Sequence, residues 1–394
     1  MPFSVRSIGE KHRNMETTML TTEQKQWVDQ VWEKLDDKLA VVAVRSRNKL
    51  PSESCEKLHN DMSREKIQYW TNGFWPGLMW LMYSGTGKDV YKRTAETGEA
   101  LLDGAFEEPE KLTHDVGFMW KLASGPNYQL TGNYKSWQRM RRAADHLMGR
   151  FNPVGEFIRA WNWGASIGEK AGWTIIDTMM NLPLLYWASV ENQDPRFKFA
   201  AMKHADKAMT SHIRPDGSVR HIAIHDPMTG ERIDEAPGQG MEIGSSWSRG
   251  QAWAIYGYIL SYIHTGKQEY LDTAKNVAHY FIANVCDDWL PKSDFRSPAE
   301  PIYYDTSAGA CAACGMLELA KVVPEHEQKL YVNAALNILK AIEAHFADWS
   351  KDTDFVIGMA SKAYTFDMNM NIIYADYYFA EAIYKLKGFE PLFW

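Results

Sequence analysis

Helical segments of two kinds alternate along most of this sequence. Segments that are apolar almost throughout, such as 75–83 and 249–264, are followed by segments with apolar residues on one side only, such as 90–106 and 270–285. A helix that is apolar all round must be enclosed, whereas a one-sided helix faces water. Setting the first kind inside the second gives two concentric rings. The sequence therefore predicts an all-α fold, an (α/α)6 toroid of about six helical hairpins.

The remaining segments continue this alternation. The first helix has a capped start at Thr21 and ends by Pro51. Further helices are expected from Asp115 onwards, over 134–148, 177–188, 196–213, 307–322 and 326–346, and from about 366, with an apolar part at 372–386.

A short repeat marks the change from one kind of helix to the other. Thr86-Gly87-Lys88 precedes Tyr91 and Ala95, and Thr265-Gly266-Lys267 precedes Tyr270 and Ala274 at the same spacing. Glycine supplies the left-handed cap that ends a helix. An open solenoid of hairpins would also repeat, but its period would be near-constant. The period here varies widely, which favours the closed ring.

Composition excludes several classes of protein. The 43 basic and 50 acidic residues give a net charge of -7, and no basic cluster is interleaved with aromatics, so nucleic acid is not expected as a partner. Four cysteines form no disulfide framework, and no apolar run suggests a signal peptide or a membrane span. We expect a cytoplasmic protein without membrane contact. The 16 tryptophans are either core residues or platforms for sugar rings.

The stretch 244–253 places Trp247, Arg249 and Trp253 within two helical turns, where a loop becomes an apolar helix. An arginine between indole rings suits a ring-shaped ligand that carries a carboxylate, such as a uronic acid sugar. Alternatively, both tryptophans belong to the core and Arg249 pairs with a structural carboxylate. The residues of this stretch leave both readings open.

Two long connections interrupt the helices and are expected to carry binding residues. Residues 151–174 contain Trp161, and residues 216–246 contain an alternating, strand-like stretch that ends at His225. His221 and His225 could suggest a metal pair, but no acid cluster matches them, and we expect no metal. The glycines at 238, 240 and 244 lack the spacing of a dinucleotide fingerprint.

Asp115 and Asp177 each stand just before an apolar helix. Capping alone would explain either of them, because aspartate is favoured at helix starts. Capping keeps a carboxylate ionised, whereas burial beside a second carboxylate raises its pKa. A pair in different environments supplies one proton donor and one charged helper. His114 is either a further donor to a ligand or an exposed neighbour.

Several motifs taken in order resemble those of glycoside hydrolase family 88, the unsaturated glucuronyl hydrolases, over nearly the whole chain. The motifs are Gly73-Phe74-Trp75-Pro76-Gly77, His114-Asp115-Val116-Gly117-Phe118, Arg159-Ala160-Trp161-Asn162, Ile176-Asp177-Thr178-Met179-Met180-Asn181, Ser246-Trp247-Ser248-Arg249-Gly250-Gln251-Ala252-Trp253 and Tyr374-Ala375-Asp376-Tyr377-Tyr378. The resemblance implies a six-hairpin toroid, here a single catalytic domain over 21–394 after a lead-in at 1–20. It also implies hydration of the C4=C5 double bond of an unsaturated uronic acid, without metal or organic cofactor.

By this resemblance, Asp177 is the general acid/base and Asp115 is its paired carboxylate. The substrate-binding residues implied are Trp75, His114, Trp161, His221, Gln239, Trp247, Arg249 and Trp253, with Trp163 as the alternative to Trp161. Relatives that favour sulfated glycosaminoglycan disaccharides carry a Ser-x-x-Ser-x-Lys motif, of which only Ser361-Lys362 is present here.

The expected partner is an unsaturated uronyl oligosaccharide, in the first place a glycosaminoglycan-type disaccharide made by a lyase, and the chain is expected to be a monomer or homodimer. The nearest alternative is an unsaturated rhamnogalacturonyl hydrolase of family 105, acting on pectin fragments. A polysaccharide lyase on a similar toroid and a non-catalytic helical-repeat binding protein are the others.

Overall fold

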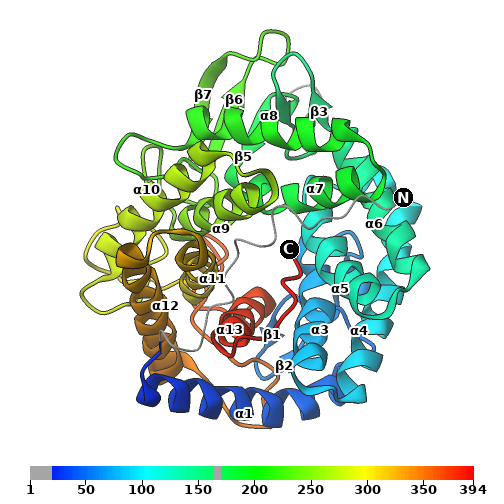
Figure 1. The fold of residues 1–394 in the computed structure, drawn as a ribbon, viewed down its shortest axis with the longest axis vertical. Helices are drawn as coiled ribbons and strands as arrows, with labels where there is room; N and C mark the ends of the chain where they lie inside the picture. The colour runs from blue at the N-terminus through cyan, green and yellow to red at the C-terminus, as the bar shows by residue number, and fades with distance from the viewer. Residues whose placement is uncertain (1–19, 163–169) are drawn as a thin grey trace.

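Two concentric rings of helices make up the body of the protein (Figure 1). The structure, a computed structural model, describes residues 20–162 and 170–394. The inner helices are α3 (Phe74–Thr86), α5 (Leu122–Thr131), α7 (Leu182–Glu191), α9 (Ser248–Thr265), α11 (Thr306–Val322) and α13 (Ile373–Leu386). The outer helices are α1 (Thr22–Arg45), α4 (Asp89–Leu101), α6 (Tyr134–Met148), α8 (Pro195–His212), α10 (Gln268–Val285) and α12 (Glu325–Phe346). Each outer helix leads into an inner one, so the predicted (α/α)6 toroid is confirmed.

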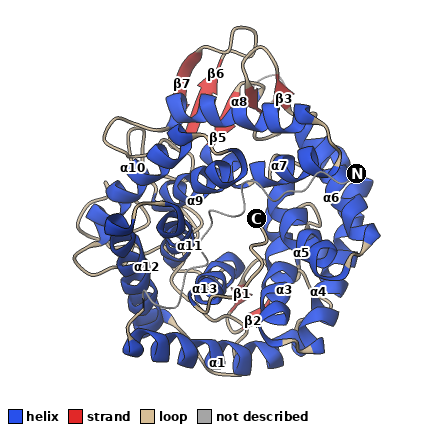
Figure 2. Cartoon of the chain, in the orientation of Figure 1, coloured by secondary structure: helices blue, strands red, loops and turns tan. Residues whose placement is uncertain are grey.

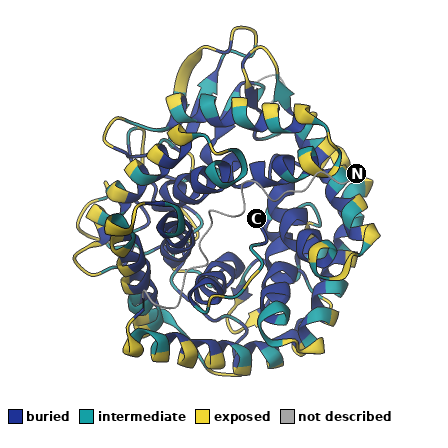
Figure 3. Cartoon of the chain, in the orientation of Figure 1, coloured by how far each residue is buried: buried dark blue, intermediate teal, exposed yellow. Residues whose placement is uncertain are grey.

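Burial follows the two kinds of sequence segment (Figure 3). In α9 every residue from Ser248 to Ser261 is buried, whereas α6 buries one face only. The ring closes where α13 packs against α3 and α1. The alternation of helix types was therefore the pattern that specified the architecture, because only an enclosed position accommodates a helix without a polar face.

The repeated Thr-Gly motif ends inner helices as predicted. Gly87 and Gly266 adopt φ values of +70° and +72°, in the left-handed region that favours glycine. The tyrosines that follow are also equivalent, since Tyr91 donates a hydrogen bond to Asp36 at 2.7 Å and Tyr270 donates one to Asp206 at 2.8 Å. The repeat therefore joins an inner helix to the next outer helix in the same way twice.

Several predicted boundaries are wrong. The first helix ends at Arg45, well before Pro51, and α13 begins only at Ile373 rather than near 366. Asp177 lies in a 3-10 turn, η8 (Ile176–Met180), ahead of α7, and Asp115 precedes a π-helical turn, η6 (Gly117–Lys121), ahead of α5. Short helical turns also occur at α2 (Met62–Glu65), η3 (Trp70–Gly73), η4 (Leu102–Glu107) and η5 (Pro109–Lys111).

Short strands occupy the long connections beside α8 (Figure 2). Strands β5 (Trp173–Ile175), β6 (Ile222–His225) and β7 (Arg232–Ala236) form an antiparallel sheet, and β6 lies within the stretch predicted to be a strand. The sheet pairs Ile175 with Ile222, and the next backbone N–H, from Ile176, donates to the carbonyl of His221 at 3.2 Å. The sheet thereby brings His221 next to Asp177. Two-residue hairpins are formed by β1 (Ser54–Cys55) with β2 (Leu58–His59) and by β3 (Phe151–Asn152) with β4 (Phe157–Ile158).

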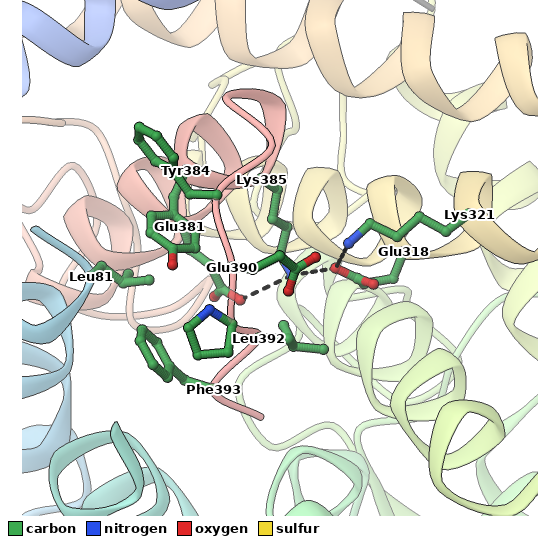
Figure 4. A pocket seen from close by; sticks show the side chains of 11 residues that line it. Leu81, Glu318, Lys321, Glu381, Tyr384, Lys385, Glu390, Leu392 and Phe393 are labelled. Carbon is green, nitrogen blue, oxygen red and sulfur yellow. Dashed lines mark hydrogen bonds and ion pairs between the residues drawn. The ribbon is translucent and has the colours of Figure 1, made fainter. Parts of the chain in front are cut away.

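The last residues of the chain pack in the centre of the ring (Figure 1). There the indole of Trp394 donates to Glu381 at 3.0 Å. Beside it, Lys385 lies between Glu318 and Glu381, at 2.5 and 3.4 Å (Figure 4). These charges are nearly fully buried, but each has an opposite charge within ion-pair distance, which offsets the cost of desolvation.

The described ranges contain neither a helix that is long and apolar enough to cross a membrane nor a group of three or more His, Cys, Asp or Glu side chains placed to hold a metal ion. The four cysteines are free thiols, and Cys311 and Cys314 are buried within α11.

Candidate active site

A cavity of about 310 Å3 opens where the inner helices begin. Asp115 precedes the helical turns of α5, Asp177 lies just before α7, Arg249 is in the first turn of α9 and Tyr374 in that of α13. Helix N-termini carry partial positive charge, so their convergence favours an anionic ligand. The lining consists of Lys66, Gln68, Tyr69, Trp70, Thr113, His114, Asp115, Trp161, Asp177, Gln239, Arg249, Lys362, Phe366 and Tyr374.

Asp115 is surrounded by hydrogen-bond donors. Its carboxylate accepts from the Thr113 hydroxyl at 3.0 Å and lies 3.4 Å from the ring Nε2 of His114. Burial raises the pKa of Asp115 to about 6, although Thr113, Arg150 and Asn181 all act to lower it.

Asp177 has far fewer partners. Its Oδ1 atom is buried without a hydrogen-bond partner among the described residues, and Nε2 of His221 lies 3.6 Å from it. Burial first, and then the negative charge of Asp115, raise the pKa of Asp177 to about 8, while Arg249 acts to lower it. At neutral pH the pair therefore consists of an ionised Asp115 and a protonated Asp177.

Neither carboxylate caps a helix. No side-chain cap bond is present at the starts of η6, α5, η8 or α7. The amide oxygen of Asn181 instead accepts from the backbone N–H of Phe118, at 2.9 Å. Because another side chain satisfies that donor, capping does not account for Asp115, and both carboxyl groups are turned towards the cavity.

Two histidines lie against the carboxyl pair in neutral form, because burial lowers their pKa values, that of His221 to about 3 and that of His114 well below its ordinary range. The backbone N–H of Gln239 donates to Nδ1 of His221 at 2.9 Å, which leaves the ring proton on Nε2, facing Asp177. His114 is held by Thr178, with 2.7 Å between Nδ1 and Oγ1. His114 is thus buried, not an exposed neighbour.

Arg249 has the structural carboxylate partner that the sequence left as an alternative. Its guanidinium pairs with Asp305 at 2.5 Å, and the two side chains are 1% and 0% exposed. It also donates to the backbone carbonyls of Ser361 and Lys362. The guanidinium lies 4.5 Å from the ring of Trp247 and 5.1 Å from that of Tyr374. Arg249 still lines the cavity, so it presents a fixed positive charge there.

Among the predicted aromatic residues, Trp161 lines the cavity. Trp75, Trp247 and Trp253 are core residues that are at most 2% exposed and do not line it. Direct sugar contact is therefore not supported for these three, and Trp247 acts at the site by stacking beside Arg249. Trp163 lies outside the described residues.

Sequence reasoning missed about half of the cavity wall. The connection before α3 contributes Lys66, Gln68, Tyr69 and Trp70. The connection before α13 contributes Phe366 and also Lys362, which the sequence analysis had noted only as part of an incomplete sulfate motif. These residues were hard to predict from the sequence, because neither connection has a periodic hydrophobic pattern. Tyr374 was within a quoted motif but had no role assigned to it.

Comparisons with known proteins agree with this arrangement. No family model matches the chain. An unsaturated glucuronyl hydrolase from Bacillus sp. (strain GL1) is 34% identical over 339 residues, which cover 82% of this chain and 88% of that protein. A solved structure of an unsaturated glucuronyl hydrolase from the same strain has a TM-score of 0.83 at 32% identity and covers 89% of this chain and 96% of its own. An unsaturated chondroitin disaccharide hydrolase from Streptococcus pyogenes serotype M1 is 32% identical over 82% of each chain.

A solved unsaturated glucuronyl hydrolase mutant from Streptococcus agalactiae, complexed with dGlcA-GalNAc6S, has a TM-score of 0.78 at 25% identity and covers 100% of this chain and 99% of its own. Identity above 30% over most of both chains, with a matching fold and a paired-carboxylate cavity, places this chain in the unsaturated glucuronyl hydrolases, glycoside hydrolase family 88.

Proposed function

We propose that this hydrolase releases 4,5-unsaturated glucuronic acid from the non-reducing end of glycosaminoglycan-type disaccharides, with Asp177 as general acid/base and Asp115 as the charged partner. The observation that carries this assignment is the unequal environment of two carboxyl groups in one cavity. Donors surround Asp115, whereas burial next to Asp115 keeps Asp177 protonated. A protonated carboxyl group at neutral pH is what protonation of a carbon–carbon double bond requires.

The reaction is a hydration followed by ring opening. The Asp177 proton moves to C4, the C4=C5 electron pair forms the new C–H bond, and C5 becomes an oxocarbenium carbon. Water adds to C5 and returns its proton to the Asp177 carboxylate. The hemiketal at C5 opens the ring, and the hemiacetal left at C1 expels the aglycone alcohol. One water is consumed, and both the acid and its partner are restored.

Charge in the cavity suits an anionic sugar. Arg249, Lys66 and Lys362 line the same cavity as the carboxyl pair. An ionised Asp115 next to a developing oxocarbenium ion stabilises positive charge in the transition state. Lys362 already forms ion pairs with Glu53 at 2.5 Å and Asp367 at 3.2 Å, so its charge is partly offset before any sulfate could bind. This supports activity on non-sulfated substrates.

The test is a panel of lyase-generated disaccharides, sulfated and non-sulfated chondroitin together with pectin fragments. Turnover is followed as loss of the ultraviolet absorbance of the conjugated double bond. We expect wild-type protein to consume the non-sulfated chondroitin disaccharide, and Asp177→Asn to fold with the wild-type circular dichroism spectrum but to lose turnover. Full activity of Asp177→Asn would refute the role of Asp177, and turnover of pectin fragments alone would favour the rhamnogalacturonyl alternative. The cytoplasmic location and the monomeric or homodimeric state remain predictions.

A further inference from the structure

Asn181 is a fully buried amide at the start of α7 that hydrogen-bonds to both of the segments that carry the carboxyl pair. Its nitrogen donates to the backbone carbonyl of Asp177 at 3.3 Å. A side-chain hydrogen bond from Asn181 also acts to lower the pKa of Asp115. Its oxygen accepts from the N–H of Phe118, three residues beyond Asp115, at 2.9 Å. The amide nitrogen and oxygen of one side chain therefore join two segments of the chain. The aspartates of these segments, Asp115 and Asp177, are 62 positions apart in the sequence.

Gly117 permits this close approach. A Cβ at residue 117 would lie 2.5 Å from the Asn181 amide oxygen and 2.7 Å from its Cα, well inside van der Waals contact. The backbone at Gly117, in the turn before α5, consequently packs directly against the side chain of Asn181, at the start of α7. This close contact leaves the two turns little freedom to shift relative to each other. The amide has no exposed surface through which water could replace its bonds.

We propose that Asn181 is a positioning residue that holds Asp115 and Asp177 at a fixed separation and donates to Asp115 alone of the two carboxylates. The proposal rests on the proposed function of the pair. Each N–H of the Asn181 amide then has a different role. One N–H holds the backbone of Asp177, and the other donates to the charged carboxylate of Asp115. The difference in pKa between the two carboxyl groups thus originates partly in a residue that need not touch the substrate.

The other groups that face the carboxyl pair do not by themselves account for the difference in pKa between Asp115 and Asp177. Asp115 also faces Thr113, His114 and the more distant Arg150, and Asp177 faces His221 and Arg249. Both histidines are neutral, and each carboxyl group has one arginine that lowers its pKa. Asn181, by contrast, lowers the pKa of Asp115 through a side-chain hydrogen bond and bonds only the backbone of Asp177.

The first test is Asn181→Asp, which keeps the size of the side chain and the acceptor for Phe118 but removes both donors. The control is Asn127→Asp, an equally buried amide in α5 that donates to the Glu99 carboxylate at 2.6 Å, away from the cavity. We expect Asn181→Asp to move the acidic limb of kcat/KM upward by about one pH unit or more, since a bond to a charged group is lost. That shift corresponds to roughly a tenfold loss of kcat/KM below the limb. Asn127→Asp should lower thermal stability without moving the limb.

A folded Asn181→Asp protein whose pH profile superimposes on that of the wild type would overturn the proposal. If this variant does not fold, the wild-type protein provides the decisive measurement. In protein labelled with 15N at asparagine side chains, one amide should titrate with a midpoint near that of Asp115, about 6, and should stop titrating in Asp115→Asn. Absence of any such amide would also overturn it. This readout needs no turnover, so it separates failure of the positioning role from failure of the proposed reaction.

Discussion

The buried ion pair between Arg249 and Asp305 offers a sharp test of how the site is built. Asp305→Asn keeps the shape of the side chain but leaves the guanidinium without its carboxylate partner, and the two side chains are 1% and 0% exposed. Removing one member of a buried pair costs about 3–5 kcal/mol. Unfolding entropy is about 2.1 cal/mol/K per residue, so a chain of 394 residues gives about 0.8 kcal/mol/K. The Tm should therefore fall by about 4–6 °C.

The same substitution should alter catalysis through charge. Arg249 lowers the pKa of Asp177, and Asp305 offsets the charge of Arg249. With that offset removed, the pKa of Asp177 should decrease, so the alkaline limb of the pH–rate profile should move to lower pH. The assays are thermal unfolding by circular dichroism and loss of the double-bond absorbance as a function of pH.

Glu156→Gln is the matched control, because it breaks an exposed ion pair with Lys203, whose side chains are 48% and 52% exposed. Pairs of this kind contribute about 0–1 kcal/mol, so its Tm should fall by no more than about 1 °C and its pH profile should stay unchanged. If Asp305→Asn has the Tm of the wild type, or if its alkaline limb moves to higher pH, the reasoning about Arg249 is refuted.

Three further predictions concern the carboxyl pair. Wild-type kcat/KM should be bell-shaped, rising as Asp115 ionises near pH 6 and falling as Asp177 ionises near pH 8; a flat profile across this range would contradict the assignment. The pKa of Asp177 is raised above its ordinary value of 3.8, so its stabilising contribution is complete below that value and lost as pH rises to about 8. The excess Tm of Asp177→Asn over wild type should accordingly grow from pH 4 to pH 8 and then level off. Gly117→Ala should reduce kcat by about tenfold or more by displacing Asn181, and wild-type kinetics in that variant would show that the contact is not needed.

Periodicity and capping residues were sufficient to predict most of the helical framework. The sequence pattern placed a helix over residues 134–148, and α6 has the same bounds. The Thr21 capping box and the Gly266 left-handed cap are formed as expected, because these signals act within a few residues of the chain. The predicted helix starts at Asp115 and Asp177 were wrong because these helices begin with distorted turns, and long-range contacts shape those turns.

The sequence by itself also placed two carboxyl groups at the starts of inner helices, since a ring of hairpins brings like ends of its helices together. It could not decide whether Arg249 met a ligand or a structural carboxylate, because Asp305 lies 56 residues further along the chain. Nor could it distinguish Trp161, at the cavity, from the buried Trp253. Those outcomes depend on which side chains the closed ring packs together, and local patterns carry no information about distances between segments that meet only in the tertiary structure.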